Sequence, residues 1–127
     1  MRYHLDTDFL IFAIGTRGRE RRRFLEIVKG DAELEISAIA WYEFCRGPRT
    51  PEQIAVARDI FGEDGIIGFT DGLAELAADQ FRRLGSPRKR AADIAIGTIA
   101  VSRKATLVTR NARDFAGIDD LELDVIS

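Results

Sequence analysis

The stretch Leu34–Arg46 (LEISAIAWYEFCR) joins a strand pattern directly to a helix pattern. Leu34 to Ser37 alternates apolar and polar residues, as a half-buried strand does. Ser37 is a preferred helix N-cap residue, and Gly47 and Pro48 follow the last helical residue. The stretch therefore predicts a strand that leads straight into a helix.

The same succession of strand and helix extends in both directions along the chain. Further strands are predicted at Arg2–Leu5, Ile66–Phe69, Thr106–Thr109 and Leu123–Ile126. Further helices are predicted at Thr7–Ile14, at Arg21–Val28, from Pro51, after a cap at Thr70 or Asp71, and at Lys89–Lys104. Strands that alternate with helices predict a parallel sheet with helices on both faces.

Length and composition narrow the class of protein. The chain has 127 residues, of which 46% are hydrophobic, so we expect one domain spanning 1–127. A single cysteine excludes a disulfide within the chain, and the single histidine argues against His-rich metal sites and a Ser-His-Asp triad. No signal peptide and no long apolar run are present, so a cytoplasmic protein without a membrane span is expected.

Three carboxylates occupy positions at which the hydrophobic pattern of the strand and helices predicts apolar residues. Asp6 directly follows the first strand, at the sheet edge where ligands of parallel sheets collect. Glu43 and Asp93 are each the only charge in an apolar helical run. Each has a simpler explanation: Asp6 as a helix N-cap, Glu43 on an exposed stripe, Asp93 as a cap or paired with Arg90. A parallel sheet, however, can gather all three at one edge.

Burying such unpaired carboxylates is costly unless a cation offsets their charge. Mg²⁺ and Mn²⁺ prefer all-oxygen ligand sets of this kind. The three acids therefore predict a divalent metal site.

Four segments, in order along nearly the whole chain, resemble the motifs of the PIN-domain family and, within it, of VapC-like toxins. They are His4–Ile11 (HLDTDFLI), Ile36–Gly47 (ISAIAWYEFCRG), Ala91–Ala100 (AADIAIGTIA) and Leu107–Phe115 (LVTRNARDF). The resemblance implies a three-layer, Rossmann-like α/β/α sandwich and Mg²⁺- or Mn²⁺-dependent cleavage of RNA. It also implies a cognate antitoxin and a homodimer.

The resemblance assigns a role to each motif residue. Asp6 and Asp93 would bind metal directly, and Glu43 would bind metal or position the attacking water. Thr109 and Asn111 would hold water molecules, and Ser37 would support the site from behind. The family usually carries Asn at Asp8 and often Asp at Asn111. Asp114 would compensate for Asn111 if its loop turned it inward; otherwise Asn111 is a helix N-cap.

A basic cluster precedes the Asp93 helix and is a candidate RNA-binding surface. It consists of Arg82, Arg83, Arg88, Lys89 and Arg90, with no acid among them. Such residues bind the phosphates of RNA independently of its base sequence. A solvated helix face or an antitoxin contact would explain the same cluster.

Two other functions fit parts of the sequence. Asp6-Thr7-Asp8 after a strand resembles the nucleophile motif of haloacid-dehalogenase-type phosphatases, in which Asp6 would attack phosphorus and Asp8 would act as general acid. That reading leaves Glu43 and Asp93 unexplained. A catalytically inactive domain that only binds RNA or an antitoxin would fit Asn111.

Overall fold

The computed structural model describes residues 1–126 and contains a five-stranded sheet in which all neighbouring strands are parallel. The strands are β1 (Arg2–Leu5), β2 (Glu33–Ser37), β3 (Ile66–Ile67), β4 (Thr106–Thr109) and β5 (Glu122–Val125). Their order across the sheet is β3-β2-β1-β4-β5, so β1 lies in the centre. The predicted parallel sheet is confirmed.

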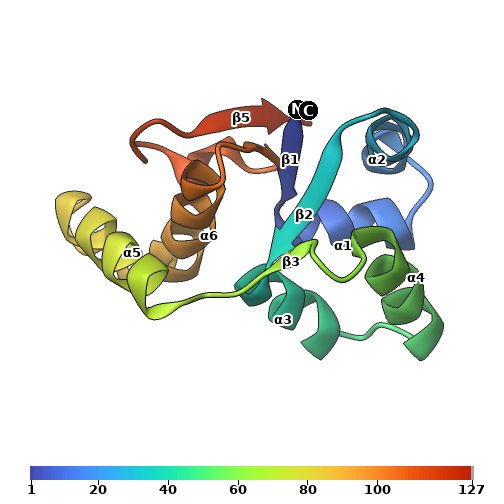
Figure 1. The fold of residues 1–127 in the computed structure, drawn as a ribbon, viewed down its shortest axis with the longest axis horizontal. Coiled ribbons are helices and arrows are strands. Elements are labelled where there is room, and N and C mark those ends of the chain that lie inside the picture. Colours follow the sequence, from blue (N-terminus) through green and yellow to red (C-terminus); the bar gives the residue numbers. More distant parts are fainter. Residues whose placement is uncertain (127) are drawn as a thin grey trace.

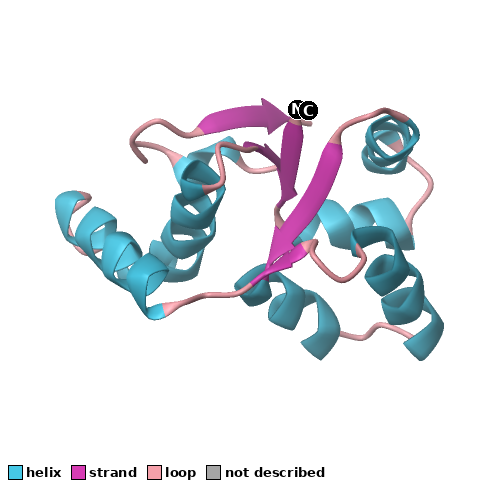
Figure 2. Cartoon of the chain, viewed as in Figure 1, coloured by secondary structure: helices cyan, strands magenta, loops and turns pink. Residues whose placement is uncertain are grey.

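Six helices cover this sheet and complete the layers. They are α1 (Thr7–Gly15), α2 (Arg19–Lys29), α3 (Ala38–Arg46), α4 (Pro51–Phe61), α5 (Asp71–Arg83) and α6 (Ala91–Ser102), with short 3-10 turns η1 (Arg88–Arg90) and η2 (Ala112–Phe115). Figure 1 shows α1, α2 and α4 on one side of the strands and α5 and α6 on the other, with α3 below the ends of β2 and β3. The colouring by secondary structure in Figure 2 shows the same layers. The predicted α/β/α sandwich is therefore confirmed.

The core lies between the sheet and the helices on each side. Leu5 of β1 is in register with Ile36 of β2 and Val108 of β4, and all three side chains are fully buried. Phe9 of α1 and Phe24 of α2 pack edge to face, with ring centroids 6.5 Å apart. The Asp6 backbone N–H donates to the Val108 carbonyl at 3.0 Å, which holds Asp6 at the end of β1.

Several elements differ from their predicted bounds by one or two residues, among them β3 and α6. The strand predicted at Ile66–Phe69 contains only Ile66 and Ile67, which are half-buried and pair with Ile36 and Ser37 of β2 before the chain leaves the sheet. The helix predicted to begin at Lys89 begins at Ala91, because Arg88–Arg90 form a separate 3-10 turn. Among residues 1–126, no helix has both the length and the apolar character needed to cross a bilayer.

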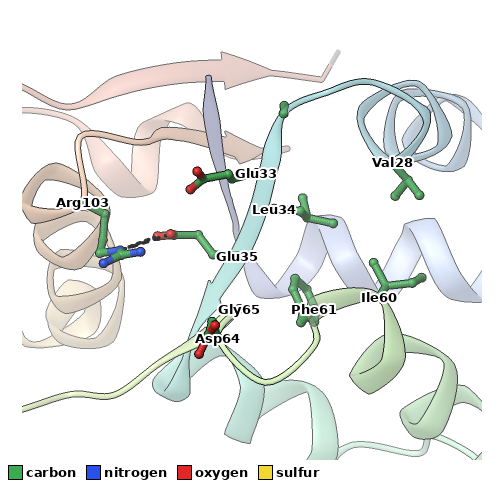
Figure 3. A pocket seen from close by; sticks show the side chains of 10 residues that line it. Val28, Glu33, Leu34, Glu35, Ile60, Phe61, Asp64, Gly65 and Arg103 are labelled. Atoms are coloured by element: carbon green, nitrogen blue, oxygen red, sulfur yellow. Dashed lines mark hydrogen bonds and ion pairs between the residues drawn. The ribbon is translucent and has the colours of Figure 1, made fainter.

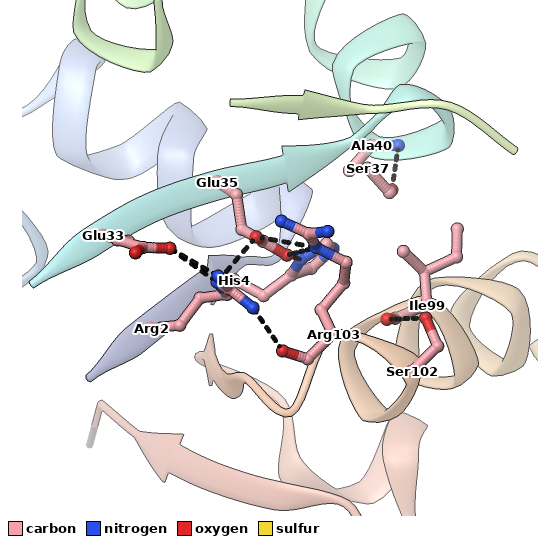
Figure 4. A network of polar contacts seen from close by, with 9 residues as sticks. All are labelled: Arg2, His4, Glu33, Glu35, Ser37, Ala40, Ile99, Ser102 and Arg103. Atoms are coloured by element: carbon pink, nitrogen blue, oxygen red, sulfur yellow. Dashed lines mark hydrogen bonds and ion pairs between the residues drawn. The ribbon is translucent and has the colours of Figure 1, made fainter. Parts of the chain in front are cut away.

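A polar network is buried in the middle of the sheet (Figure 4). His4 Nδ1 lies 2.6 Å from Glu35 Oε2, and Arg103 Nε donates to Glu35 Oε1 at 3.1 Å. The side chains of His4 and Glu35 are 0% and 3% exposed. Burial alone would raise the pKa of Glu35, but the hydrogen bond from His4 and the charges of His4 and Arg103 outweigh burial and lower that pKa.

Candidate active site

The candidate residues gather where the central strands end. Asp6 follows β1, while Ser37 and Thr109 are the last residues of β2 and β4, the two neighbours of β1. The chain runs from β1 to β2 on one side and later returns to β4 on the other, so this is the point at which the strand order reverses. Ligands of open parallel sheets bind at such points.

Five carboxylates from four elements line one pocket of about 250 Å³ at this edge. They are Asp6, Asp8, Glu43, Asp93 and Asp114, and Thr7, Ile11 and Arg46 complete the lining. The three acids that stood out in the sequence therefore share one pocket, although they come from β1–α1, α3 and α6. Asp114 also reaches the pocket, because η2 turns it inward.

Asp6 is held rigidly by hydrogen bonds to both of its carboxylate oxygens. The backbone N–H of Thr7 donates to Oδ1 at 2.8 Å, so Asp6 also acts as the N-cap of α1. The Thr109 hydroxyl donates to Oδ2 at 2.8 Å and accepts from the Asn111 backbone N–H at 3.0 Å. The end of β4 thus supports Asp6 from behind.

Glu43 reaches the pocket because two residues orient it and its helix. The Thr7 hydroxyl donates to Glu43 Oε1 at 2.7 Å and so links the start of α1 to α3. Ser37 caps α3 by accepting from the Ala40 backbone N–H at 3.0 Å. Ser37 is fully buried and does not line the pocket. Its contribution is to aim the helix that carries Glu43.

Asp93 and Asp114 enter the pocket from α6 and η2. Asp93 lies in the first turn of α6, where the partial positive charge of the helix N-terminus favours an acid. The helix begins before Asp93, so Asp93 is not its N-cap. The Arg90 guanidinium donates to the backbone carbonyls of Asp114 and Ala116. Arg90 therefore holds η2 in place and keeps Asp114 beside α6.

The proximity of these acids makes two of them hard to ionise. Burial, followed by the charges of Asp93 and Asp8, raises the pKa of Asp6 to about 7, against the hydrogen bonds from Thr109 and Thr7. Burial, followed by the charges of Asp114, Glu43 and Asp8, raises the pKa of Asp93 to about 6. Charge repulsion of this kind is relieved by a proton or by a cation.

Without a cation, the protein is expected to lose stability as the pH rises from about 5 to 8. The pKa of Asp6 is 3.8 in a free chain and about 7 in the folded protein. Between these values the unfolded chain releases a proton that the folded protein keeps, so rising pH favours unfolding until about pH 7. About two pH units separate pH 5 from pH 7, so at ~1.4 kcal/mol per unit the loss across the tested range is on the order of 3 kcal/mol.

Melting temperatures in EDTA across this pH range would measure the effect. Asp6→Asn serves as the matched control, because it removes the titrating group, and its melting temperature should vary less with pH. If the melting temperatures of the wild type and Asp6→Asn changed equally between pH 5 and 8, the predicted cost of ionising Asp6 would be contradicted.

The chemistry of the pocket fits a hard divalent cation. Its donors are carboxylate and hydroxyl oxygens, the ligands that Mg²⁺ and Mn²⁺ prefer. Each ionised carboxylate has about four lone-pair sites, so Asp6 keeps free acceptor capacity beside its two hydrogen bonds. Within residues 1–126, no three His, Cys, Asp or Glu side chains are already grouped as ligands of one ion. Mg²⁺ commonly needs only one or two carboxylates and takes waters for the rest.

Some residues singled out in the sequence lie beside the pocket instead of in it. Thr109 and Asn111 do not line the pocket; Asn111 Nδ2 donates to Asp8 Oδ2 at 3.2 Å and makes no side-chain cap to η2. Conversely, Thr7 and Arg46 line it and had no role in the sequence analysis. Arg46 stands three residues after Glu43 on α3, and this spacing was the signal that could have found it.

The basic cluster divides into three parts. Arg82 and Arg83 are exposed on α5, and both form ion pairs with Asp79, while Arg83 also pairs with Asp119. Arg90 is engaged by backbone carbonyls. Arg88 and Lys89 are exposed in η1 and have no side-chain hydrogen bond or ion pair with another residue of 1–126. These two cations are therefore free to bind an anion next to α6.

A larger hollow of about 480 Å³ lies away from the five carboxylates (Figure 3). It surrounds the outer edge of β2, where β3 pairs only with Ile36 and Ser37. Leu34, Ile60 and Phe61 line its apolar part, and Glu35 and Arg103 line its polar part. None of the candidate residues lies there, so size alone does not identify the site.

Comparison with known proteins identifies the family and agrees with the fold. A family model described as PIN domain matches residues 3–121. A toxin–antitoxin complex from Klebsiella pneumoniae contains a chain 28% identical, with a TM-score of 0.71 and 94% of each chain covered. Two further structures share the fold. One is VapBC-1 from nontypeable Haemophilus influenzae, with 23% sequence identity, a TM-score of 0.72 and 98% of each chain covered. The other is VapBC2 from Rickettsia felis bound to a promoter DNA fragment, with 20% sequence identity, a TM-score of 0.74 and 100% of each chain covered. No curated protein matches the chain.

Proposed function

The chain belongs to the PIN-domain family, and from this premise we propose that it is a metal-dependent endoribonuclease, the toxin of a toxin–antitoxin pair. The observation that carries the proposal is the pocket into which Asp6, Glu43, Asp93 and Asp114 converge from separate elements. Carboxylates concentrated at the switch point of a parallel sheet suit the binding of a cation and the phosphodiester it acts on.

The side chains of the pocket have distinct roles in this proposal. Asp6 and Asp93 hold Mg²⁺ or Mn²⁺, which when bound supplies water activation and neutralises charge on the phosphate. Glu43 orients the attacking water, and Thr7 fixes the Glu43 carboxylate for this task. Thr109 fixes Asp6 in the same way, and Asp114 supplies the carboxylate that Asn111 lacks. The proposed products are a 5′-phosphate and a 3′-hydroxyl.

Incubation of the purified protein with RNA and Mn²⁺, with and without EDTA, tests this function. The expected result is RNA cleavage that EDTA abolishes, together with a higher melting temperature in Mn²⁺ because the ion binds the folded state only. Hydrolysis of phosphomonoesters alone would instead indicate the phosphatase. A folded protein that performs neither reaction would be the inactive binding module.

Arg88 and Lys89 are the members of the basic cluster that we expect to bind RNA. Replacing both with Ala should weaken RNA binding and lower the slope of log affinity against log salt by ~1.4, since each phosphate contact on a single strand contributes ~0.7. Fluorescence anisotropy at several salt concentrations measures both quantities. Arg82→Ala/Arg83→Ala is the matched control, because these side chains are already paired on α5. Equal effects in the two double variants would assign the whole cluster to general surface charge.

An apolar groove on the α1, α2 and α4 side is the surface that we assign to the antitoxin. Ala13, Phe24, Leu25, Val56 and Ile60 line this groove, which has a volume of about 520 Å³. Leu25 and Val56 are 43% and 53% exposed, which favours a partner that covers them. One solved relative is a toxin–antitoxin complex, which supports a protein partner for this chain. The proposal includes a homodimer.

A further inference from the structure

Tyr42 is an exposed aromatic side chain next to the acidic pocket. It lies on α3 directly before Glu43, and 62% of it is exposed. Its neighbour Trp41 behaves differently, because the Trp41 ring stacks on Phe44 at 5.7 Å and packs against the core. The helix therefore turns Trp41 inward and leaves Tyr42 in solvent, although both are large aromatic residues.

Arg46 connects this tyrosine to the pocket. Residues four apart lie on the same side of a helix, and Arg46 Cζ is 5.4 Å from the centre of the Tyr42 ring. Arg46 also lies three residues from Glu43, and its guanidinium is 3.9 Å from Glu43 Oε2. Among the residues of 1–126 that line the pocket, Arg46 is the only basic one. Arg46 therefore lies between Glu43 of the pocket and the exposed Tyr42 side chain.

We propose that Tyr42 and Arg46 bind the nucleotide adjacent to the cleaved phosphodiester, the base stacking on Tyr42 and a phosphate pairing with Arg46. This proposal rests on the proposed nuclease function and names the side chains that contact the strand next to the cleaved bond. Bases stack on exposed aromatic rings regardless of sequence, and arginine binds the phosphate through two donors. In a duplex the bases are paired inside the helix and present no free face to Tyr42.

The arrangement also sets the path of the strand. Arg46 stands on the α3 rim of the pocket, whereas Arg88 and Lys89 stand beside the start of α6, which carries Asp93. Because α3 packs against α6, and Glu43 and Asp93 of these two helices line the pocket, we expect a strand bound at both basic positions to pass over that pocket. The stacked base then fixes which phosphodiester lies over Asp6 and Asp93.

Binding is tested in the Asp6→Asn background, so that the RNA is not consumed. The probe is an oligouridine with a terminal fluorophore and one 2-aminopurine, placed at each position in turn, and its duplex with oligoadenosine is the comparison. Tyr42→Ala should weaken single-strand binding roughly 5- to 100-fold. Tyr42→Phe keeps the ring and should bind within about twofold of the parent. Arg46→Ala should lower the salt slope by ~0.7.

Quenching of 2-aminopurine locates the stacked base. One or two positions should be quenched by the parent and by Tyr42→Phe but not by Tyr42→Ala, and the duplex should bind independently of Tyr42. Equal affinity and quenching in the parent and Tyr42→Ala would overturn the proposal. So would a Tyr42→Ala protein whose mass in light scattering shows loss of a dimer, because Tyr42 would then belong to a contact between two copies.

Failure of this site and failure of the nuclease are distinguishable. Binding that depends on Tyr42, in a wild-type protein that cleaves no RNA, would support the stacking site and contradict the nuclease. Metal-dependent cleavage, together with an RNA affinity that Tyr42→Ala leaves unchanged, would support the nuclease and contradict the stacking site.

Discussion

Asp6→Asn is expected to lower the rate of RNA cleavage by at least roughly 10²–10³-fold, the loss typical of removing one group that supports charge stabilisation in the transition state. Asn has the shape of Asp but lacks the charge that would hold the cation. The fold should survive, because the Thr7 N–H can still donate to a side-chain oxygen. Loss of a carboxylate whose pKa is raised to about 7 should even stabilise the cation-free protein at pH 8.

Asp8→Asn is the matched control for this prediction. Asp8 is exposed, lies two residues away and accepts from Asn111 Nδ2. The family usually carries Asn at this position, so Asp8→Asn should keep most of the activity. The measurement is the cleavage rate of a single-stranded RNA in Mn²⁺, with folding checked by circular dichroism. A folded Asp8→Asn protein as inactive as Asp6→Asn would mean that Asp8 is a ligand or, as in the phosphatase, a general acid.

Glu35→Ala is expected to lower the free energy of unfolding by ~3–5 kcal/mol, the cost of breaking a buried ion pair. The Glu35 side chain is 3% exposed and accepts from both His4 and Arg103. Removal of Glu35 takes away the hydrogen-bond partner of His4 Nδ1. The other ring nitrogen of this buried side chain, Nε2, already has no hydrogen-bond partner among residues 1–126. Such a loss is a large share of the ~5–15 kcal/mol that stabilises a typical domain.

Glu33→Ala provides the comparison on the same strand. Glu33 pairs with Arg2 at 2.6 Å, but its side chain is 68% exposed, so its removal should cost ~0–1 kcal/mol. Urea denaturation of the two variants measures the difference. The pKa of Glu35 is lowered from 4.5, so its contribution is complete above pH 4.5 and is lost as the pH falls through the folded value. Equal stability of the two variants would show that the network contributes nothing.

The sequence alone determined the order and type of nearly every element. Strand and helix periodicities are local properties, so Arg2–Leu5, Thr106–Thr109 and the helix that Ser37 caps are found as predicted. The sequence also singled out Asp6, Glu43 and Asp93, because an isolated charge in an apolar run is visible without coordinates. The sequence could not give the length of β3, because β3 ends where its pairing with Ile36 and Ser37 of β2 ends.

Only the tertiary structure decided which side chains face the same pocket and what supports them. Asp114 lines the pocket because Arg90 binds the carbonyls of η2, an interaction across 24 residues that no local pattern contains. The bonds from Thr109 to Asp6 and from Thr7 to Glu43 join residues 103 and 36 positions apart. Their geometry arises from packing of the whole sheet. The candidate acids could therefore be identified from the sequence, whereas their convergence in one pocket and the resulting shifts in pKa required the fold.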